Sequence, residues 1–306
     1  MAPPLKNLSS IGGIQVMKRK SPLSITSGRL AVLLALVLCL PLMSGCSQEA
    51  KEAAEALEAV KASYAAAAEA LEEKNAEVDD AIASLTEAMG SEIKPLDDAT
   101  LTDCEVAISA AQGAKATAPE MAETTEEIQA QVDELESVDY TDQLAAMDEA
   151  KVALENSIKQ REQITNPTDA FIIQRLTGVD HIQTPTAVTE DMDPNGQLNK
   201  QGGYTATVYF LSDLVDQSDV YVDEFDSTGN EVIDKGTEGG GAVEVYATEE
   251  EATKRSEYLG TYDGTILASG SHTVYGTCVI RTSDKLTASQ QKELEAAVFE
   301  ALTRLE

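Results

Sequence analysis

The chain has 306 residues, of which 54 are acidic and 22 basic, for a formal net charge of −32 at pH 7. A surface this acidic repels nucleic acid and anionic lipid headgroups, so we expect no nucleic-acid partner. Tryptophan is absent and aromatic residues make up 4% of the chain, so exposed aromatic platforms for bases or sugars are expected to be scarce.

The segment from Arg29 to Cys46 reads RLAVLLALVLCLPLMSGC. It follows a basic cluster, Lys18 to Lys20, and its apolar run is shorter than the roughly 20 residues of a membrane span. Small residues then lead into one cysteine, which is the order of a bacterial lipoprotein signal peptide. We therefore predict that residues 1–45 are removed and that Cys46 becomes the lipidated N-terminus. The alternative is an ordinary secretory signal with an incidental cysteine.

The basic cluster directly follows Met17, so we predict that translation starts there and that the signal is about 29 residues long. A diacylglyceryl group has two acyl chains, which suffice for stable attachment. The membrane is thus the first expected partner, and the expected location is its extracytoplasmic face. Residues 1–45 hold five of the 22 basic residues and none of the 54 acidic ones, so 17 basic residues remain and the mature charge is near −37.

Residues 46–165 are rich in Ala, Glu and Leu and predict a helical region. Its first helix carries a seam at intervals of seven: Leu57, Tyr64, Leu71, Val78 and Leu85. A heptad over five repeats is typical of a coiled coil, and a straight helix over 48–89 would be about 60 Å long. Asn75 on this seam is expected to set register or partner number.

Gly90 and Pro95 end the first helix. Three shorter amphipathic helices follow, around 101–111, 121–135 and 144–158, and their short connections predict antiparallel neighbours. Two arrangements stay open: a free coiled coil that self-associates, and a bundle within one chain.

Residues 166–306 change to a period of two. We predict strands over 204–210 and 242–246, then a pair over 265–268 and 272–282 with its turn at 269–271. Helices are expected to begin near Pro167, with Asn166 as cap, and at the capping boxes of Thr248 and Thr287. The expected fold class is α then α+β: a helical coiled-coil or bundle stalk, then a small antiparallel-sheet α+β sandwich domain with helices on a face.

This second half resembles an uncharacterised family of secreted proteins and lipoproteins of Gram-positive bacteria, some labelled as a wall-associated adhesin. The matching segments are Asp193–Leu198, Gly202–Tyr204, Gly240–Tyr246 with Ala252, Arg255 and Tyr258, Gly270–His272, and Val279–Gln290. The resemblance covers roughly 166–302 and implies an exported location. It implies no known ligand or catalytic residue.

Asp191-Met192-Asp193-Pro194-Asn195-Gly196 copies the start of a calcium-binding loop, with oxygen ligands from Asp191, Asp193 and Asn195 and a Gly for the turn. The twelfth position, however, is Gly202 where that loop has a bidentate Glu. The alternative is a Pro-Asn-Gly turn that directs the chain into the next strand, with Asp193 capping it.

The chain contains no G-x-S-x-G, H-E-x-x-H, C-x-x-C or Walker motif. His272 lies beside Ser269 and Ser271, but sequence neighbours in a turn seldom form a nucleophile and base pair. Cys104 and Cys278 are expected to be lone buried thiols. We therefore expect no enzyme and no cofactor other than calcium.

The sequence favours a lipid-anchored surface protein whose helical spacer presents an α+β interaction domain to a surface or wall partner. The alternative is a ligand-binding or calcium-binding lipoprotein with its site in the α+β domain.

Overall fold

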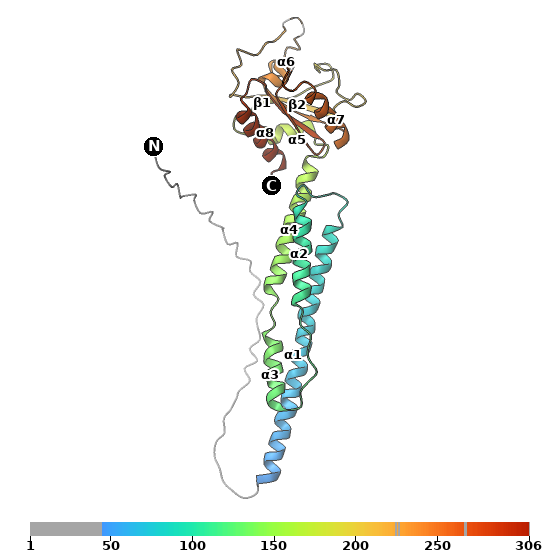
Figure 1. The fold of residues 1–306 in the computed structure, drawn as a ribbon, viewed down its shortest axis with the longest axis vertical. Helices are drawn as coiled ribbons and strands as arrows, with labels where there is room; N and C mark the ends of the chain where they lie inside the picture. The colour runs from blue at the N-terminus through green and yellow to red at the C-terminus, as the bar shows by residue number, and fades with distance from the viewer. Residues whose placement is uncertain (1–44, 224, 226, 266–267, 306) are drawn as a thin grey trace, which may run out of the picture. The chain divides into compact units, whose positions relative to one another are not determined.

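The computed structural model describes residues 45–223, 225, 227–265 and 268–305. The predicted signal peptide and its start at Met17 lie outside these residues. A long helical N-terminal region precedes an antiparallel five-stranded sheet with helices, which confirms the broad fold class (Figure 1). Residues Ala53–Glu306 form one compact unit, and a domain boundary at 165/166 stays a prediction.

The helical region contains α1 (Gly45–Met89), α2 (Ala99–Ala114), α3 (Thr125–Ser137) and α4 (Thr141–Gln163). The heptad residues of α1 from Leu71 onward are buried in a core that the other three helices complete. This core includes Leu71, Val78, Leu85, Cys104, Ala111, Val132, Leu135, Met147 and Leu154. The later part of the seam is therefore covered by the chain's own helices, as in a bundle. A coiled coil with a second chain stays a prediction.

Asn75 fixes α1 against the connections on either side of α3. Its Nδ2 donates to the carbonyl of Ala116 at 3.0 Å, and its Oδ1 accepts from the hydroxyl of Tyr140 at 2.8 Å. The Tyr140 oxygen in turn accepts the backbone N–H of Ala116 at 2.8 Å. A slip of α1 by one turn would break both hydrogen bonds of Asn75, so Asn75 sets register within one chain.

Helices α3 and α4 follow one another along the helical region, with only residues 138–140 between them (Figure 1). They do not pack side by side, so the expected antiparallel packing is wrong for this pair. Instead, α4 packs against α2.

The end of α4 is fastened to the α+β domain. Ile164, directly after α4, is fully buried in the domain core. Its carbonyl accepts the backbone N–H of Thr277 at 3.0 Å, while the Thr277 hydroxyl accepts the N–H of Asn166 at 2.7 Å. Gln160 and Gln163 donate to backbone carbonyls at the end of the last helix. These bonds join the last turn of α4 to both a hairpin turn and the last helix.

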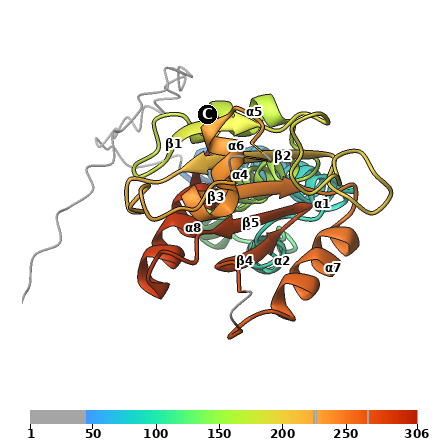
Figure 2. The ribbon, with the colours of Figure 1, turned by 90° about the horizontal axis from the view of Figure 1, so that it is seen from above.

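The sheet has the strand order β1-β2-β3-β5-β4, and every neighbouring pair is antiparallel. Its strands are β1 (Gln183–Ala187), β2 (Ala206–Leu211), β3 (Gly240–Val245), β4 (Ser271–Tyr275) and β5 (Cys278–Thr282). In Figure 2 the strands β2, β3, β5 and β4 follow one another across the sheet.

Two sequence predictions about this sheet are wrong. The last hairpin turns at Gly276–Thr277 rather than at 269–271, because Gly276 has a φ of +57° that suits a two-residue hairpin loop. Of the predicted strand 265–268, the described residues are not in a strand. β1 was not predicted, because its sequence, QTPTA, is polar and contains a proline. The proline is tolerated because β1 is an edge strand of the sheet.

Helices pack on both faces of the sheet rather than on one. On the first face, α5 (Asp169–Leu176) and α8 (Ala288–Thr303) cover the apolar core around Phe210, Val243 and Ile280. On the second face lie α6 (Glu231–Lys235), which a 3₁₀ turn (Gly236–Gly239) joins to β3, and α7 (Glu249–Gly260). The predicted one-sided arrangement failed because the alternate residues of the strands, which include Glu244 and Arg281, are also buried.

The predicted helix starts hold with one exception. Thr287 forms the complete capping box with Gln290, and the side chain of Thr248 accepts the N–H of Glu251. The cap of α5 is Thr168 and not Asn166, whose φ of +49° places it in the preceding turn. Cys104 and Cys278 are free and buried, as predicted, and burial raises the pKa of Cys278 to about 12.

Gly276→Ala is expected to destabilise the protein by about 3 kcal/mol, because a Cβ there would lie 2.4 Å from the Ile164 carbonyl oxygen in addition to the positive φ. Gly264→Ala is the matched control: its φ is +72° but a Cβ would meet no atom within 4 Å, so about 1 kcal/mol is expected. Urea unfolding measures both, and equal losses would contradict the close approach.

Candidate functional site

A buried carboxylate lies at the centre of the second face. Glu244 in β3 has a side chain that is 1% exposed. Its Oε2 accepts from the Tyr246 hydroxyl at 2.9 Å and from Arg255 Nε at 2.8 Å. Its Oε1 accepts from Arg255 Nη2 at 3.0 Å and from Arg281 Nη1 at 2.8 Å. One carboxylate thus joins β3 to β5 and to α7.

The two arginines keep Glu244 ionised. Burial by itself would raise the pKa of Glu244, but the charge of Arg281 and the charge and hydrogen bonds of Arg255 outweigh burial and hold the pKa below its ordinary value. The same carboxylate raises the pKa of the Tyr246 hydroxyl, after the larger effect of burial. Removing one partner would leave an uncompensated buried charge, which typically costs 3–5 kcal/mol.

A second carboxylate organises the loop before β2. Asp193 accepts the backbone N–H groups of Asn195, Gln197 and Leu198 at 3.0, 2.5 and 2.7 Å, and it also accepts the Tyr204 hydroxyl. Partial burial would raise the pKa of Asp193, but these four hydrogen bonds, led by that of Tyr204, hold it below its ordinary value. The loop is thereby closed onto the ring of Tyr204.

The two networks meet at a pocket of about 600 Å³, here named the Arg255 pocket. Tyr204 and Tyr246 line this pocket and form an edge-to-face pair, with ring centroids 6.3 Å apart. A Cβ on Gly203 would lie 2.0 Å from the Gln197 carbonyl oxygen, so only glycine allows the loop to fold back here. The lining residues are Asn195, Gln197, Gln201, Gly202, Gly203, Tyr204, Tyr246, Glu251, Lys254, Arg255 and Tyr258.

Arg255 brings unused donors to this pocket. A guanidinium has five N–H donors, and Glu244 takes one from Nε and one from Nη2. The other three, two on Nη1 and one on Nη2, have no acceptor among the residues that the structure describes. The Arg255 side chain is 20% exposed, and its Cζ lies 5.8 Å from the ring centroid of Tyr258.

The structure assigns different partners to the three residues of the predicted calcium loop. Asp191 accepts from the Thr189 hydroxyl at 2.6 Å. The amide of Asn195 donates to the hydroxyls of Tyr209 and Tyr204. Asp193 forms the Pro-Asn-Gly turn, in which Gly196 N–H donates to its carbonyl at 3.2 Å.

These contacts confirm the turn and leave calcium binding a prediction. In the described part of the chain, no three His, Cys, Asp or Glu side chains are grouped so as to hold a metal ion.

His272 lies in β4 and contacts Ser256 and Asp263 rather than Ser269 or Ser271. Its Nδ1 lies 2.8 Å from Oγ of Ser256 in α7, and its Nε2 lies 3.4 Å from a carboxylate oxygen of Asp263. Ser269 and Ser271 bond instead to Arg281 and Thr282. Ser256 lies in the middle of α7, where the surrounding backbone N–H groups are used by the helix, so no oxyanion hole faces it.

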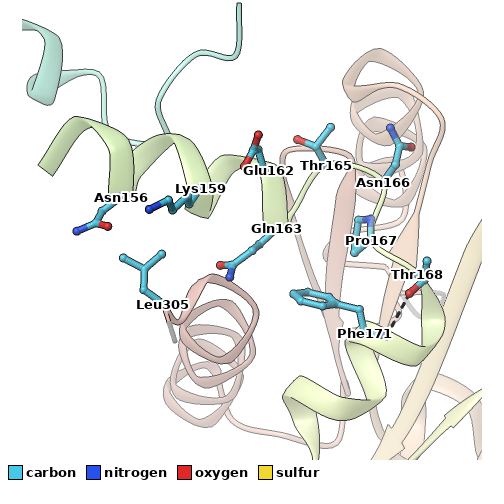
Figure 3. A pocket seen from close by; sticks show the side chains of 10 residues that line it. All are labelled: Asn156, Lys159, Glu162, Gln163, Thr165, Asn166, Pro167, Thr168, Phe171 and Leu305. Atoms are coloured by element: carbon cyan, nitrogen blue, oxygen red, sulfur yellow. Dashed lines mark hydrogen bonds between the residues drawn. The ribbon is translucent and has the colours of Figure 1, made fainter. Parts of the chain in front are cut away.

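A second pocket, of about 540 Å³, lies where α4 meets α5 and the end of α8. Figure 3 shows Phe171, Pro167 and Leu305 as its apolar side chains, among polar ones that include Lys159 and Gln163. Gln163 already donates to the Arg304 carbonyl. Because this pocket is built from residues that fasten α4 to the domain, we assign it a structural role.

Sequence reasoning missed Glu244, Arg255 and Arg281 as site residues. A signal was present, since Glu244 and Arg281 are charged residues inside strands that are otherwise apolar or β-branched, and such residues are rarely buried without partners. The partner Arg255 had no such signal, because its position on α7 reads as an exposed helix face.

No known protein family, curated protein or solved structure matches this chain. Within the described ranges, none of the helices is both long enough and apolar enough to span a membrane.

Asp193→Asn is expected to lower the free energy of unfolding by about 2 kcal/mol, because it weakens a charged acceptor of four hydrogen bonds. Asp191→Asn is the control, since Asp191 is exposed and accepts from one neighbouring hydroxyl, and a change within about 0.5 kcal/mol is expected. Repeating both unfolding measurements with calcium tests the metal prediction: calcium ligation would stabilise the wild type and not the Asp193 variant.

Stability is expected to fall as the pH falls below about 4. The folded-state pKa values of Glu244 and Asp193 lie below their unfolded values, so their contribution is present above the unfolded pKa and is lost as the pH falls through the folded pKa. Chemical unfolding at pH 7, 5, 4 and 3 measures this. Asp193→Asn should reduce the slope, and an unchanged slope would contradict the assignment for Asp193.

Proposed function

We propose that this chain is a lipid-anchored extracytoplasmic protein without enzymatic activity. Cys46 is lipidated, the helices α1–α4 act as a spacer, and the α+β domain binds a small ligand in the Arg255 pocket at the cell surface or wall. One observation carries the binding function. Glu244 holds the Arg255 guanidinium at a pocket, and three of its N–H donors have no acceptor among the described residues.

Two features support the anchored spacer. α1 begins at Gly45, immediately before Cys46, and continues without a break to Met89. At about 1.5 Å per residue, the part of α1 from Ala53 onward is about 55 Å long. The contacts of Ile164 and Thr277 then hold the end of α4 in the core of the α+β domain, so the domain cannot swing freely on a flexible linker.

A coiled coil between two chains is proposed only for the start of the heptad seam, before Leu71. The seam residues from Leu71 onward are buried within the chain, and the hydroxyl of Tyr64 donates to the Pro119 carbonyl. Leu57 is half-buried and lies outside that core. We therefore propose self-association only through the segment around Leu57.

The resemblance described above stays part of the proposal for the exported location alone. It implies no known ligand or catalytic residue, so the binding site is proposed from the geometry of the Arg255 pocket.

The lack of enzymatic activity is part of the proposal. The Arg255 pocket is lined by amides, tyrosines and charged groups, and the carboxylate nearest to Arg255, that of Glu244, is ion-paired with two arginines. The Ser256–His272 pair belongs to α7 and β4 and does not line it.

Cys46→Ala is expected to abolish membrane attachment in a bacterial host that processes lipoproteins, because the thioether can form only on cysteine. Fractionation and labelling with a radioactive fatty acid measure the loss, which should be more than tenfold in the label. Ser47→Ala is the matched control and should keep both. Retention of label and membrane fraction by Cys46→Ala would contradict the lipid anchor.

A further inference from the structure

The free edge of Arg255 has the geometry of a second carboxylate site. Glu244 binds the Nε and Nη2 side of the guanidinium at 2.8 and 3.0 Å. The remaining edge, formed by Nη1 and Nη2, presents two parallel N–H donors, and a carboxylate or phosphate accepts such a pair bidentately. The residue lines the Arg255 pocket, so a ligand entering it can reach this edge.

The guanidinium is held in place before any ligand arrives. Glu244 clamps it from one side, and its Cζ lies over the ring of Tyr258. A preorganised side chain loses little conformational entropy on binding, so more of the interaction energy appears as affinity.

The charge of the buried group favours an anion at Arg255, although the whole chain is acidic and the carboxylate of Asp193 lies in the neighbouring network. The buried group of Glu244, Arg255 and Arg281 carries two positive charges and one negative charge. The pocket lining adds Lys254 and Glu251, which offset one another. Lys254 pairs with Glu250 at 2.8 Å, but both side chains are exposed, and such surface pairs are weak enough to exchange. An acidic ligand group on Arg255 would therefore neutralise the excess positive charge of the buried group formed by Glu244, Arg255 and Arg281.

The rest of the lining suits hydroxyl groups. Gln197 and Gln201 each carry an amide that can both donate and accept, as a hydroxyl requires. Asn195 offers its amide oxygen as an acceptor, because its Nδ2 already donates to Tyr204 and Tyr209. The volume of about 600 Å³ lies within the usual range for small-ligand sites.

We propose that the Arg255 pocket binds a small hydroxyl-rich acid of about the size of a sugar, with its acidic group on the free edge of Arg255. This inference rests on the proposed ligand-binding function and names its ligand class.

Isothermal titration calorimetry on the detergent-solubilised full chain tests the proposal with three probes that share one ring: glucuronate, glucose 6-phosphate and glucose. At least one acid is expected to bind about tenfold more tightly than glucose, because only an acid can form the charged bidentate pair. Which acid binds more tightly shows whether the site prefers a carboxylate or a phosphate.

Substitutions at three positions test whether the acid binds in the Arg255 pocket. Arg255→Lys keeps the charge but loses the planar fork, and about tenfold weaker acid binding is expected. Because Arg255 also holds Glu244, Lys254→Gln provides a second test that leaves the buried network intact; about threefold weaker acid binding is expected, with glucose unchanged. Lys159→Gln, in the pocket of Figure 3, is the charge-matched control and should bind like the wild type.

Equal binding of glucose and both acids would overturn the acidic ligand class but leave the binding function standing. Weaker binding by Lys159→Gln, with no effect of the pocket variants, would overturn the location. If none of the three probes binds, the inference fails, whereas the proposed binding function fails only if a thermal-shift screen of neutral and cationic small molecules is negative as well.

Discussion

The second face of the sheet depends on one buried carboxylate. The Glu244 side chain is 1% exposed, so its charge is stabilised by Arg255, Arg281 and Tyr246, which donate to it together. Those bonds link β3 to β5 and to α7, and they also decide which edge of Arg255 is occupied and which edge is left for a ligand. Packing, electrostatics and the candidate site are therefore consequences of the same charged group.

A second constraint joins the helical region to this domain. Ile164 follows α4 directly and occupies the apolar core on the opposite face of the sheet, where Gly276 leaves room for its carbonyl. The two faces of the sheet thus contact different parts of the protein. The apolar face holds the helical region and the last helix, and the polar face holds the loop of Asp193 and the pocket.

Local patterns in the sequence predicted the parts of the structure that local interactions determine. The heptad residues of α1 from Leu71 onward are buried, Thr248 and Thr287 cap the expected helices, and the central strands lie close to their predicted positions. Errors occur where the pattern is weak. β1 is short and polar. The last hairpin was misplaced because 272–282 is rich in β-branched residues and reads as one continuous strand, although Gly276 divides it.

The sequence by itself determined the order of helical region and α+β domain, the free cysteines, the Asp193 turn and the expectation of a lipid anchor at Cys46. Each of these is encoded by residues close together in the chain or by composition. Only the tertiary structure decided that helices cover both faces of the sheet and that Asn75 sets register within one chain. It also decided that Asp193, Tyr204, Glu244, Arg255 and Arg281 meet around one pocket. The physical reason is that strand register and helix docking set those neighbours, and both depend on contacts between residues far apart in sequence.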